Sequence, residues 1–470
     1  MAEPIRCVAI VGAGFCGTVT AIHLLRQAHA APLLIRLIDR ERHARGVAYA
    51  AQPDPHLLNV PAGRMSAFSG EPLDFLHFAR RTLPGTTSED FLPRALYGEY
   101  LEESLAVAEE RAPAQIRLER VTGNVCSLEL LRPGHTFVLG FPNGTELAAT
   151  DVVLAFGNPP PAPLPGANEL RGSPRLIENP WSSPATDAPD ETLLLVGTGL
   201  TMADVVLSAM RRPRPPRLVH AISRHGLLPP GQTAFGQAHP QFEALPLLRA
   251  ASLSIRRLLR LVRRLARDAE ERGGDWREAV TFVRSLAPRL WSRLPARERE
   301  RFLRHLRAYW DIHRHRLPPD TRATLERLRA AQRLTVHAGR ILNLAPEGDG
   351  VRVTWRARGA AVPATFHVDR VINCTGPDYR CRAAHDPLIK DLLNTGLIQP
   401  DALQLGLQVS PEGGVLNITG KPTRGLHYIG PMLRAQHWEA TAVQELREYA
   451  ERLALTLTAP ANSHLAAASV

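Results

Sequence analysis

Three glycines near the N-terminus have the spacing of a phosphate-binding turn. Gly12, Gly14 and Gly17 form a GxGxxG pattern directly after the apolar run at residues 7–11. The first glycine makes the tight bend, the second lets the backbone approach a pyrophosphate, and the third lets the next helix pack closely on the strand. The helix N-terminus then offers N–H donors and partial positive charge to the phosphates. The pattern predicts a nucleotide cradle made of Gly12, Ala13, Gly14, Phe15, Cys16 and Gly17.

An acidic residue completes this first motif. Asp39 ends a second apolar run, residues 33–38, and lies 22 positions after Gly17. That is where a carboxylate accepts hydrogen bonds from an adenosine ribose. The first motif combines a strand, a glycine turn, a helix and an acidic residue at the expected spacings. This combination favours a dinucleotide site over a glycine turn that binds nothing.

The second half of the chain repeats this arrangement with one change. Residues 191–196 read as a strand, followed by the turn Gly197-Thr198-Gly199-Leu200-Thr201 and a helix at 203–210. Met202 takes the place of the third glycine, so this helix should pack less closely on its strand. Arg224 lies 22 positions after Met202, where the first motif has Asp39. An arginine there can pair with a 2′-phosphate, which predicts NADPH rather than NADH; the alternative is an exposed arginine in a loop.

Two further stretches carry side chains suited to binding. Asn59, Arg64 and Ser66 lie in a Pro- and Gly-containing loop and offer hydrogen bonds and a charge to an aromatic ring system; a packed surface loop is the alternative. Residues 302–319 are dense in His, Arg and aromatic side chains. They could bind an anionic substrate, or they could be a helix C-terminus whose cations offset the helix dipole.

The elements that must position these residues alternate between strands and helices. Residues 151–155 are expected to form a buried strand that leads into Gly157, and residues 366–373 are expected to form a strand that leads into Cys374-Thr375-Gly376. Separate strands are expected at 333–337 and 340–346, and a closing helix at 438–454. The pattern predicts an α/β protein.

Length and composition indicate a globular protein of two or three domains. The chain has 470 residues, of which 44% are hydrophobic and 22% charged. No apolar run is long enough for a membrane span, and the N-terminus lacks a signal-peptide pattern, so a cytoplasmic location is expected. The five cysteines show no CxxC or metal-type spacing, so we expect reduced thiols and neither a disulfide framework nor a metal site.

The positive charge is concentrated in one segment. The net charge is +11, and residues 249–340 hold 24 arginines against 10 acidic residues. No nucleic-acid-binding motif accompanies this charge, so nucleic acid is not an expected partner. Residues 244–334 read as helical, and a stripe through Leu253, Leu258, Leu261, Val262 and Leu265 favours a packed helix with a solvated face over a membrane-surface helix.

The chain resembles the FAD-NAD(P)-binding family of bacterial flavoproteins, distant relatives of flavin-containing and N-hydroxylating monooxygenases. The resemblance lies in the segments VAIVGAGFCG, HLLNVPAGRMSAF, LLLVGTGLTMAD, RHLRAYWDIHRHR, VINCTGP and GPMLRAQHWEATAVQELR. It implies two Rossmann-like dinucleotide-binding domains with a helical insertion, as in two-dinucleotide-binding flavoproteins. The FAD-binding domain would span 1–165 and 365–470. The NAD(P)H-binding domain would span 190–364, with the insertion at about 244–334.

The resemblance also implies an activity and a set of site residues. The expected activity is NADPH-dependent N-oxygenation of an amino acid or small amine by dioxygen through a flavin C4a-hydroperoxide, with an anionic amino acid such as aspartate as one candidate substrate. Asn59 and Arg64 would act in catalysis, and the substrate would meet Arg64, Trp310, His313, Arg314, His315 and Trp438. Besides the two glycine turns with Asp39 and Arg224, the cofactors would contact Arg40, Asn59, Met65, Ser66, Val125, Gly157, Thr375, Gly376, Gly430 and Pro431.

Three other functions share these motifs. An NADPH oxidase or dehydrogenase without oxygen transfer would carry all of them. A disulfide reductase would need a redox cysteine pair, and Cys374 and Cys381 do not have that spacing. A flavin-binding redox sensor or docking protein could use the arginine-rich helices as its interface. The sequence leaves homo-oligomer formation open.

Overall fold

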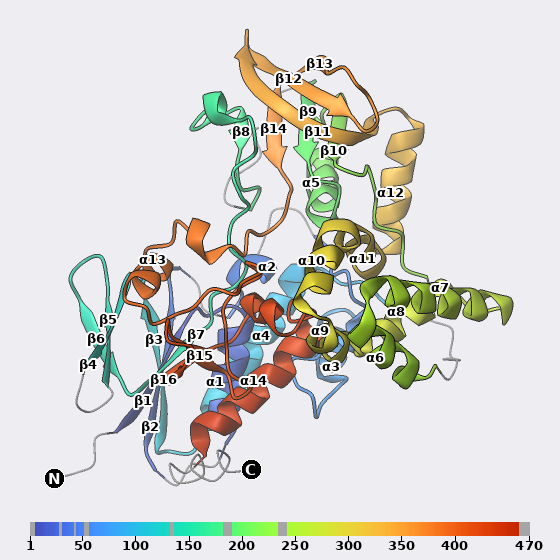
Figure 1. Cartoon of the computed structure of the whole chain (residues 1–470). Coiled ribbons are helices and arrows are strands. Elements are labelled where there is room, and N and C mark those ends of the chain that lie inside the picture. Colours follow the sequence, from blue (N-terminus) through green and yellow to red (C-terminus); the bar gives the residue numbers. More distant parts are fainter. Residues whose placement is uncertain are drawn as a thin grey trace. The chain divides into compact units, whose positions relative to one another are not determined.

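The computed structural model describes residues 5–27, 31–41, 44–50, 56–131, 136–181, 190–233 and 242–459. It divides into two compact units (Figure 1). The first unit comprises Met1–Gln52, Val60–Pro159 and Tyr379–Val470, and the second comprises Pro53–Asn59 and Pro160–Asp378. None of the helices in these described ranges combines the length and the hydropathy that a bilayer crossing requires.

The first unit is built on a six-stranded sheet with the order β15-β16-β7-β1-β2-β3, in which only β15 runs antiparallel to its neighbour. A separate antiparallel sheet, β4-β5-β6, precedes β7 in the chain. The strands are β1 (Arg6–Val11), β2 (Leu33–Asp39), β3 (Ile116–Thr122), β4 (Ser127–Leu131), β5 (Thr136–Gly140), β6 (Glu146–Ala149), β7 (Asp151–Leu154), β15 (Gly414–Leu416) and β16 (Pro422–Tyr428). The helices are α1 (Phe15–Arg26), α2 (Gly46–Tyr49), η1 (Ala62–Arg64), α3 (Asp74–Thr82), α4 (Arg94–Glu110), η3 (Cys381–Ala383), α13 (Pro387–Asn394), η4 (Pro431–Ala435) and α14 (Val443–Thr458).

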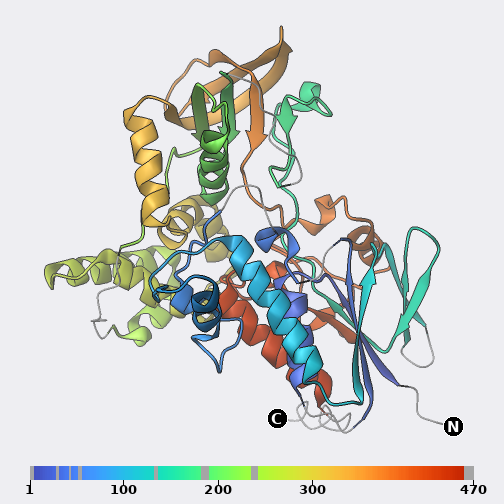
Figure 2. The same cartoon turned by 180° about the vertical axis from the view of Figure 1, so that it is seen from behind.

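Burial explains why β1 and α1 lie at the centre of this unit. β1 pairs with β2 on one side and β7 on the other, so its apolar run is covered along both edges. Ten of the twelve residues of α1 are buried, because α4 and α14 pack against it. Figure 2 shows these three helices side by side, in blue, cyan and red. A strand and a helix this well packed hold the turn between them in a fixed position.

The second unit contains a seven-stranded sheet with the order β13-β12-β11-β10-β9-β14-β8. Strands β11, β10, β9, β14 and β8 are parallel, and β12 and β13 add an antiparallel extension. The strands are β8 (Leu176–Ile177), β9 (Thr192–Val196), β10 (Leu218–Ser223), β11 (Leu334–Glu347), β12 (Gly350–Ala357), β13 (Ala364–Val368) and β14 (Arg370–Asn373).

The helices of the second unit fall into two groups. η2 (Asn168–Leu170) and α5 (Leu200–Arg211) precede β10. The remaining helices form the crossover between the parallel strands β10 and β11, where the sequence predicts a helical segment. They are α6 (Ala244–Leu253), α7 (Ile255–Glu271), α8 (Trp276–Ser285), α9 (Ala287–Arg293), α10 (Ala296–His305), α11 (Arg307–Arg314) and α12 (Pro319–Ala330).

Three expected elements differ from the structure. The strand expected at 366–373 is two strands, because the chain turns at Asp369, whose carboxylate and backbone N–H both bond the backbone of Thr192. The two strands expected at 333–337 and 340–346 are one continuous strand, β11, with an irregularity between Ile341 and Asn343. The closing helix begins at Val443 rather than at Trp438.

Candidate functional site

The first glycine turn is held tightly between β1, β2 and the end of β7. Gly12 has φ 108° and donates its N–H to Ile38 O at 2.8 Å. A Cβ at Gly12 would lie 2.6 Å from Ala155 O, and one at Gly17 would lie 1.9 Å from Gly12 O. No other residue fits at either position without displacing backbone, so these two glycines have the structural roles that their spacing predicts.

Asp39, at the end of β2, is hydrogen-bonded to the turn. Its Oδ2 accepts the backbone N–H of Ala13 at 2.7 Å, and Ala13 is fully buried. The carboxylate therefore fixes the turn. The neighbouring Arg40 donates to Asn124 Oδ1 at 2.7 Å and forms an ion pair with Asp386.

The glycine turn of the second unit is held by the same pattern of hydrogen bonds. Gly197 has φ 116° and donates its N–H to Ile222 O at 2.8 Å, and a Cβ at Gly197 would lie 2.2 Å from Cys374 O. Gly197 thus corresponds to Gly12, and the end of β14 corresponds to the end of β7. Because Ile222 corresponds to Ile38, Ser223 corresponds to Asp39.

The prediction that Arg224 stands at the position of Asp39 is therefore wrong by one residue. Arg224 corresponds to Arg40. The stretch from Met202 to Ser223 is one residue shorter than the stretch from Gly17 to Asp39. A count of 22 positions from Met202 therefore reaches Arg224, one residue too far.

Ser223 ties down its turn through hydroxyl groups. Its Oγ lies 2.9 Å from the Thr198 Oγ1 and accepts the Gly226 N–H at 3.0 Å, and the Thr198 hydroxyl donates to Leu227 O at 2.6 Å. These hydrogen bonds hold the second turn without a carboxylate. A serine followed by an arginine leaves the end of β10 without the negative charge that Asp39 gives the end of β2.

A group of cationic side chains lies just beyond Ser223. Arg224 is exposed, and burial together with the guanidinium groups of Arg358 and Arg224 lowers the pKa of His225. Arg358 follows β12, and its N–H bonds Ala338 O at 2.8 Å. The end of β10 therefore favours an anionic group.

Both helix N-termini are open to a phosphate. Gly14 and Gly199 are the N-cap residues of α1 and α5, and neither helix has a side-chain cap. A Cβ at Gly199 would meet nothing within 4 Å, and one at Gly14 would meet only Gly46 Cα, at 3.7 Å. The free N–H groups and open backbone fit the pyrophosphate of a dinucleotide in each unit.

Two more predicted cofactor positions converge on the first turn. A Cβ at Gly430 would lie 2.9 Å from Phe156 O, and the Tyr428 hydroxyl donates to the same oxygen at 3.4 Å. Gly430 and Pro431 therefore lie beside the segment that leads from β7 to Gly157.

In the second unit, the Thr375 hydroxyl bonds Asn373 Oδ1 at 2.6 Å just after β14, ahead of Gly376.

Residues 9–159 match the sequence profile of the family described as FAD-NAD(P)-binding. That segment contains the whole first glycine turn, Asp39 and β7. The comparison with curated proteins finds no match.

Solved structures of similar fold cover nearly the whole chain. They include the reduced ornithine hydroxylase of Pseudomonas aeruginosa, at TM-score 0.61 and 15% identity over 98% of this chain and 100% of that one. The ornithine N-hydroxylase of Kutzneria sp. 744, solved with reduced FAD, NADP⁺ and L-ornithine, gives TM-score 0.60 and 17% identity over 97% and 99%. The FAD-bound cadaverine monooxygenase of Erwinia amylovora gives TM-score 0.63 and 12% identity over 97% and 95%. At these identities the likeness establishes the fold, that of two-dinucleotide-binding flavoproteins.

The loop that follows β2 is divided between the two units. Asn59 belongs to the second unit, and Arg64, Met65 and Ser66 belong to the first. Met65 and Ser66 are buried, and Arg64 is half-buried at the end of η1. The Ser66 hydroxyl donates to Glu71 O at 2.6 Å, and Ser66 O accepts from Arg447 at 2.8 Å. The side chain of Val125 is buried in the core of this unit.

The predicted substrate residues of the second unit lie at the C-terminal end of α11. His313 Nδ1 is 2.7 Å from Tyr309 O, and its ring meets the Trp276 ring edge-on at 5.0 Å. Arg314 Nη1 lies 3.1 Å from His315 Nδ1, and Trp310 is half-buried on the same helix. This is the helix-terminus arrangement that the sequence left open as an alternative.

Trp438 lies in the first unit under an arginine. It is 4% exposed, and the Arg434 guanidinium lies 3.9 Å from its ring centroid. Its ring is therefore covered on that face.

The cysteines are all free thiols, and Cys126 alone is not buried. Burial raises the pKa of the Cys16 thiol to about 12 and also raises that of Cys374. Within the described ranges, no group of three His, Cys, Asp or Glu side chains is arranged to hold a metal ion.

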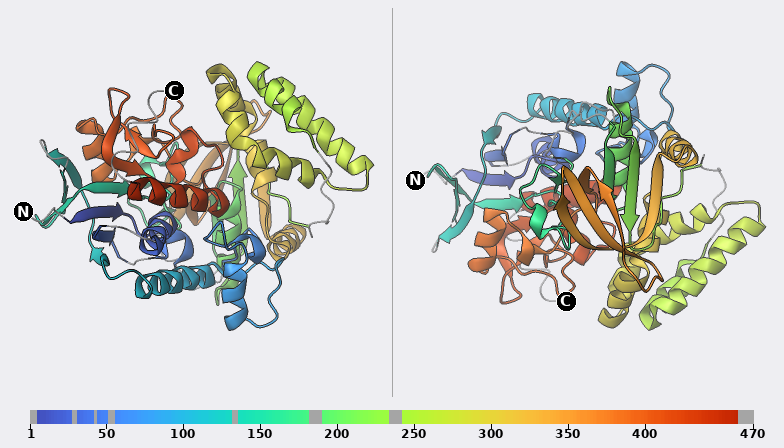
Figure 3. Two further views of the ribbon diagram at one scale, coloured as in Figure 1. Left: turned by 90° about the horizontal axis from the view of Figure 1, so that it is seen from below. Right: turned by 90° about the horizontal axis from the view of Figure 1, so that it is seen from above.

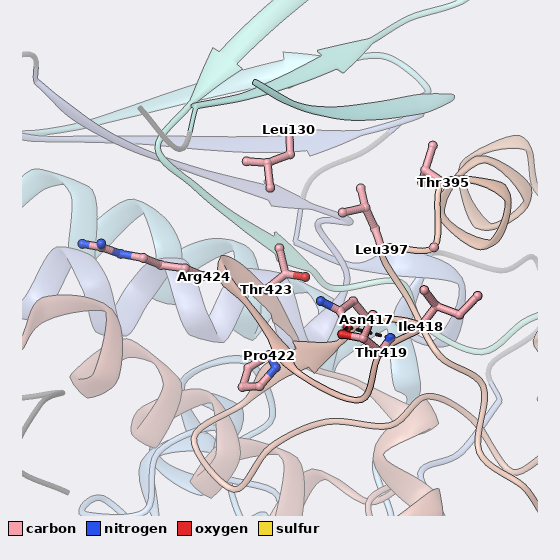
Figure 4. Close-up of a pocket in the computed structure, with 10 residues that line it drawn as sticks. Leu130, Thr395, Leu397, Asn417, Ile418, Thr419, Pro422, Thr423 and Arg424 are labelled. Carbon is pink, nitrogen blue, oxygen red and sulfur yellow. Dashed lines mark hydrogen bonds between the residues drawn. The ribbon is translucent and has the colours of Figure 1, made fainter. Parts of the chain in front are cut away.

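An open groove of about 400 Å³ lies in the first unit, between β4, the segment after α13 and the turn that joins β15 to β16. Figure 4 shows the side chains that line it. Leu130, Leu397 and Ile418 line it together with threonines and Arg424. None of the predicted cofactor residues lines this groove.

Sequence reasoning missed three residues of the candidate cofactor sites: Ser223, Arg358 and Tyr428. Ser223 could have been found by aligning the ends of the two second strands rather than counting from the glycines. Arg358 and Tyr428 carry no local signal, because strand pairing and a tyrosine hydrogen bond bring them to their positions.

Proposed function

We propose that the chain is an FAD-dependent, NADPH-using oxidoreductase, and that it is a monooxygenase that oxygenates the nitrogen of an amino acid or small amine. The observation that carries this proposal is the repeated turn frame, with a carboxylate at the end of β2 and a serine followed by an arginine at the end of β10. The carboxylate of the first unit suits a dinucleotide with a free ribose hydroxyl, and the serine and arginine of the second unit suit a 2′-phosphate.

In this proposal the first unit holds FAD and the second holds NADPH. The N–H groups at the start of α1 and the backbone at Gly14 would hold the FAD pyrophosphate, and Asp39 would accept from the adenosine ribose. At α5, Gly199 would admit the NADPH pyrophosphate, while Arg224 and Arg358 would bind its 2′-phosphate. Bound FAD supplies a hydride acceptor and the capacity to activate dioxygen.

The remaining roles concern the substrate. Asn59 and Arg64 are proposed to act next to the flavin ring, and the His- and Arg-rich end of α11 is proposed to bind an anionic amino acid. The named substrates of the similar folds, ornithine and cadaverine, are small amines, which supports an amine nitrogen as the acceptor. A monooxygenase must also exclude water from the reacting centre, which is a task for the protein rather than for the cofactor.

The test is a coupled assay on the purified chain. After reconstitution with FAD, NADPH and oxygen consumption would be measured with ornithine, lysine, cadaverine and aspartate in turn, together with hydroxylamine and hydrogen peroxide. We expect one amine to raise hydroxylamine and lower peroxide. Peroxide that no amine alters would identify an oxidase, and no NADPH oxidation would favour a sensor or docking protein. Protein that does not take up FAD would end the proposal.

A further inference from the structure

Helix α7 carries an arginine face on one side and an apolar face on the other. Arg256, Arg257, Arg260, Arg263, Arg264 and Arg267 are all exposed. At 100° per residue they fall in an arc about 120° wide, and they extend for about 16 Å along the helix. Leu258 is buried on the opposite face, where α7 packs against α6 and α8. Figure 3 shows α7 alongside the other helices of this segment.

The arginine face lacks the neutralisation that the neighbouring helices have. Elsewhere in the helical segment, Arg277 pairs with Asp275, Arg301 with Glu298, and Arg322 with Glu326. No acidic residue occurs between Ile255 and Arg267, and within the described part of the chain no ion pair involves any of the six arginines.

This arrangement weakens the isolated helix. Arg256 and Arg260 are like charges at i,i+4, as are Arg260 and Arg264, and such pairs are destabilising. Arg256 and Arg257 also stand in the first turn of α7, where the helix dipole disfavours a cation. An anionic surface against this face would relieve both effects.

Two exposed leucines on α6 precede this face in the sequence. Leu253 is 59% exposed and ends α6 directly before α7, and Leu245 on the same helix is 56% exposed. Exposed apolar side chains on the preceding helix, together with a row of cations on α7, suit an anionic bilayer, where cations meet headgroups and apolar groups can reach the acyl boundary. A nucleic acid would use the arginines and leave the leucines without a partner.

We propose that α7 is a peripheral docking surface for anionic phospholipid, with its six arginines against the headgroups. The apolar face of α7 remains packed within the protein, so α7 itself does not insert into the bilayer, and its contact with the headgroups is electrostatic. This surface is independent of the proposed redox activity.

Vesicle flotation of the full-length, FAD-reconstituted protein tests the proposal. The vesicles would be phosphatidylcholine alone or phosphatidylcholine mixed with phosphatidylglycerol, at low and high salt. We expect binding only to the mixed vesicles, and loss of that binding at high salt. The quadruple variant Arg260→Gln, Arg263→Gln, Arg264→Gln and Arg267→Gln should bind at least about 100-fold more weakly, because each basic residue contributes near the surface.

A charge-matched variant separates this face from net charge. Arg111, Arg117, Arg214 and Arg329 are exposed and lie outside α7. Their replacement by Gln changes the net charge equally and should leave vesicle binding within about twofold. Circular dichroism would confirm that both variants fold. Absent vesicle binding, equal loss in both variants, or binding of duplex DNA or RNA in place of vesicles would overturn the proposal.

Discussion

Asp39 and Ser223 occupy the same position in the two units, each one residue beyond the carbonyl that accepts the N–H of the first turn glycine. Asp39 binds the turn through a carboxylate, and Ser223 binds it through a hydroxyl. The two frames therefore share their geometry and differ by one negative charge.

Replacing Asp39 separates its structural role from its cofactor role. Asp39→Ala leaves the buried Ala13 N–H without its acceptor, which should cost about 1–3 kcal/mol of unfolding free energy. Asp39→Asn keeps an acceptor oxygen and should cost less, while still weakening FAD binding because the charge is lost. Urea unfolding and FAD titration of both apo-proteins measure the two effects. Equal FAD affinity in Asp39→Asn and the wild type would contradict a ribose contact.

A carboxylate at Ser223 should reverse the nucleotide preference. Ser223→Asp places a negative charge beside the expected 2′-phosphate, so kcat/KM for NADPH should fall by about 10- to 100-fold relative to NADH. Arg224→Gln should raise KM for NADPH with little change for NADH, whereas the exposed Arg214→Gln should change neither. Steady-state NADPH and NADH oxidation gives the ratios. An unchanged ratio in Ser223→Asp would place the adenosine end elsewhere.

Gly17 should be intolerant of a methyl group. Its Cβ would lie 1.9 Å from Gly12 O, so Gly17→Ala must push α1 away from the turn and should cost at least about 1–3 kcal/mol. Gly70 is exposed, with nothing within 4 Å of its Cβ position, and Gly70→Ala should stay within about 0.5 kcal/mol of the wild type. Thermal unfolding of the two apo-variants makes the comparison. Similar midpoints would contradict the close packing of Gly17 against Gly12.

Acid should destabilise the second unit through a pair of histidines. His220 Nδ1 and His337 Nε2 lie 3.0 Å apart on adjacent strands, next to Trp355 and Phe366. Burial lowers both pKa values, and the His337 ring adds to this for His220, whose pKa falls to about 4. The unfolded chain thus binds more protons than the folded one below the ordinary histidine pKa. The pair therefore leaves the unfolding free energy undiminished above pH about 6.5 and lowers it as the pH falls towards 4.

The matched variants for this pair are His337→Gln and His367→Gln. His337→Gln retains a hydrogen-bonding group without a titrating ring, so it should flatten the loss of unfolding free energy between pH about 7 and pH about 5. His367 is exposed on β13 and touches neither ring of the pair, so His367→Gln should retain the wild-type slope. Urea unfolding across that pH range measures both slopes. Parallel slopes in all three proteins would rule out the pair as the source.

Local patterns account for the parts of the fold that the sequence predicts well. Each strand–turn–helix unit is encoded within about 30 consecutive residues, by an apolar run, by glycines and by helical periodicity. The helical segment between β10 and β11 was predictable for the same reason. The strands β13 and β14 were not, because the turn at Asp369 depends on Thr192, far away in the chain.

The sequence by itself determined that there are two glycine turns, that one is followed by a carboxylate, and that an arginine-rich helical segment lies in the second half. Only the tertiary structure decided that Ser223, and not Arg224, corresponds to Asp39, and that Arg358 lies near the end of β10. Such correspondences are set by hydrogen bonds between strands that are distant in sequence. A count along the chain cannot follow a one-residue difference in the segment that connects them.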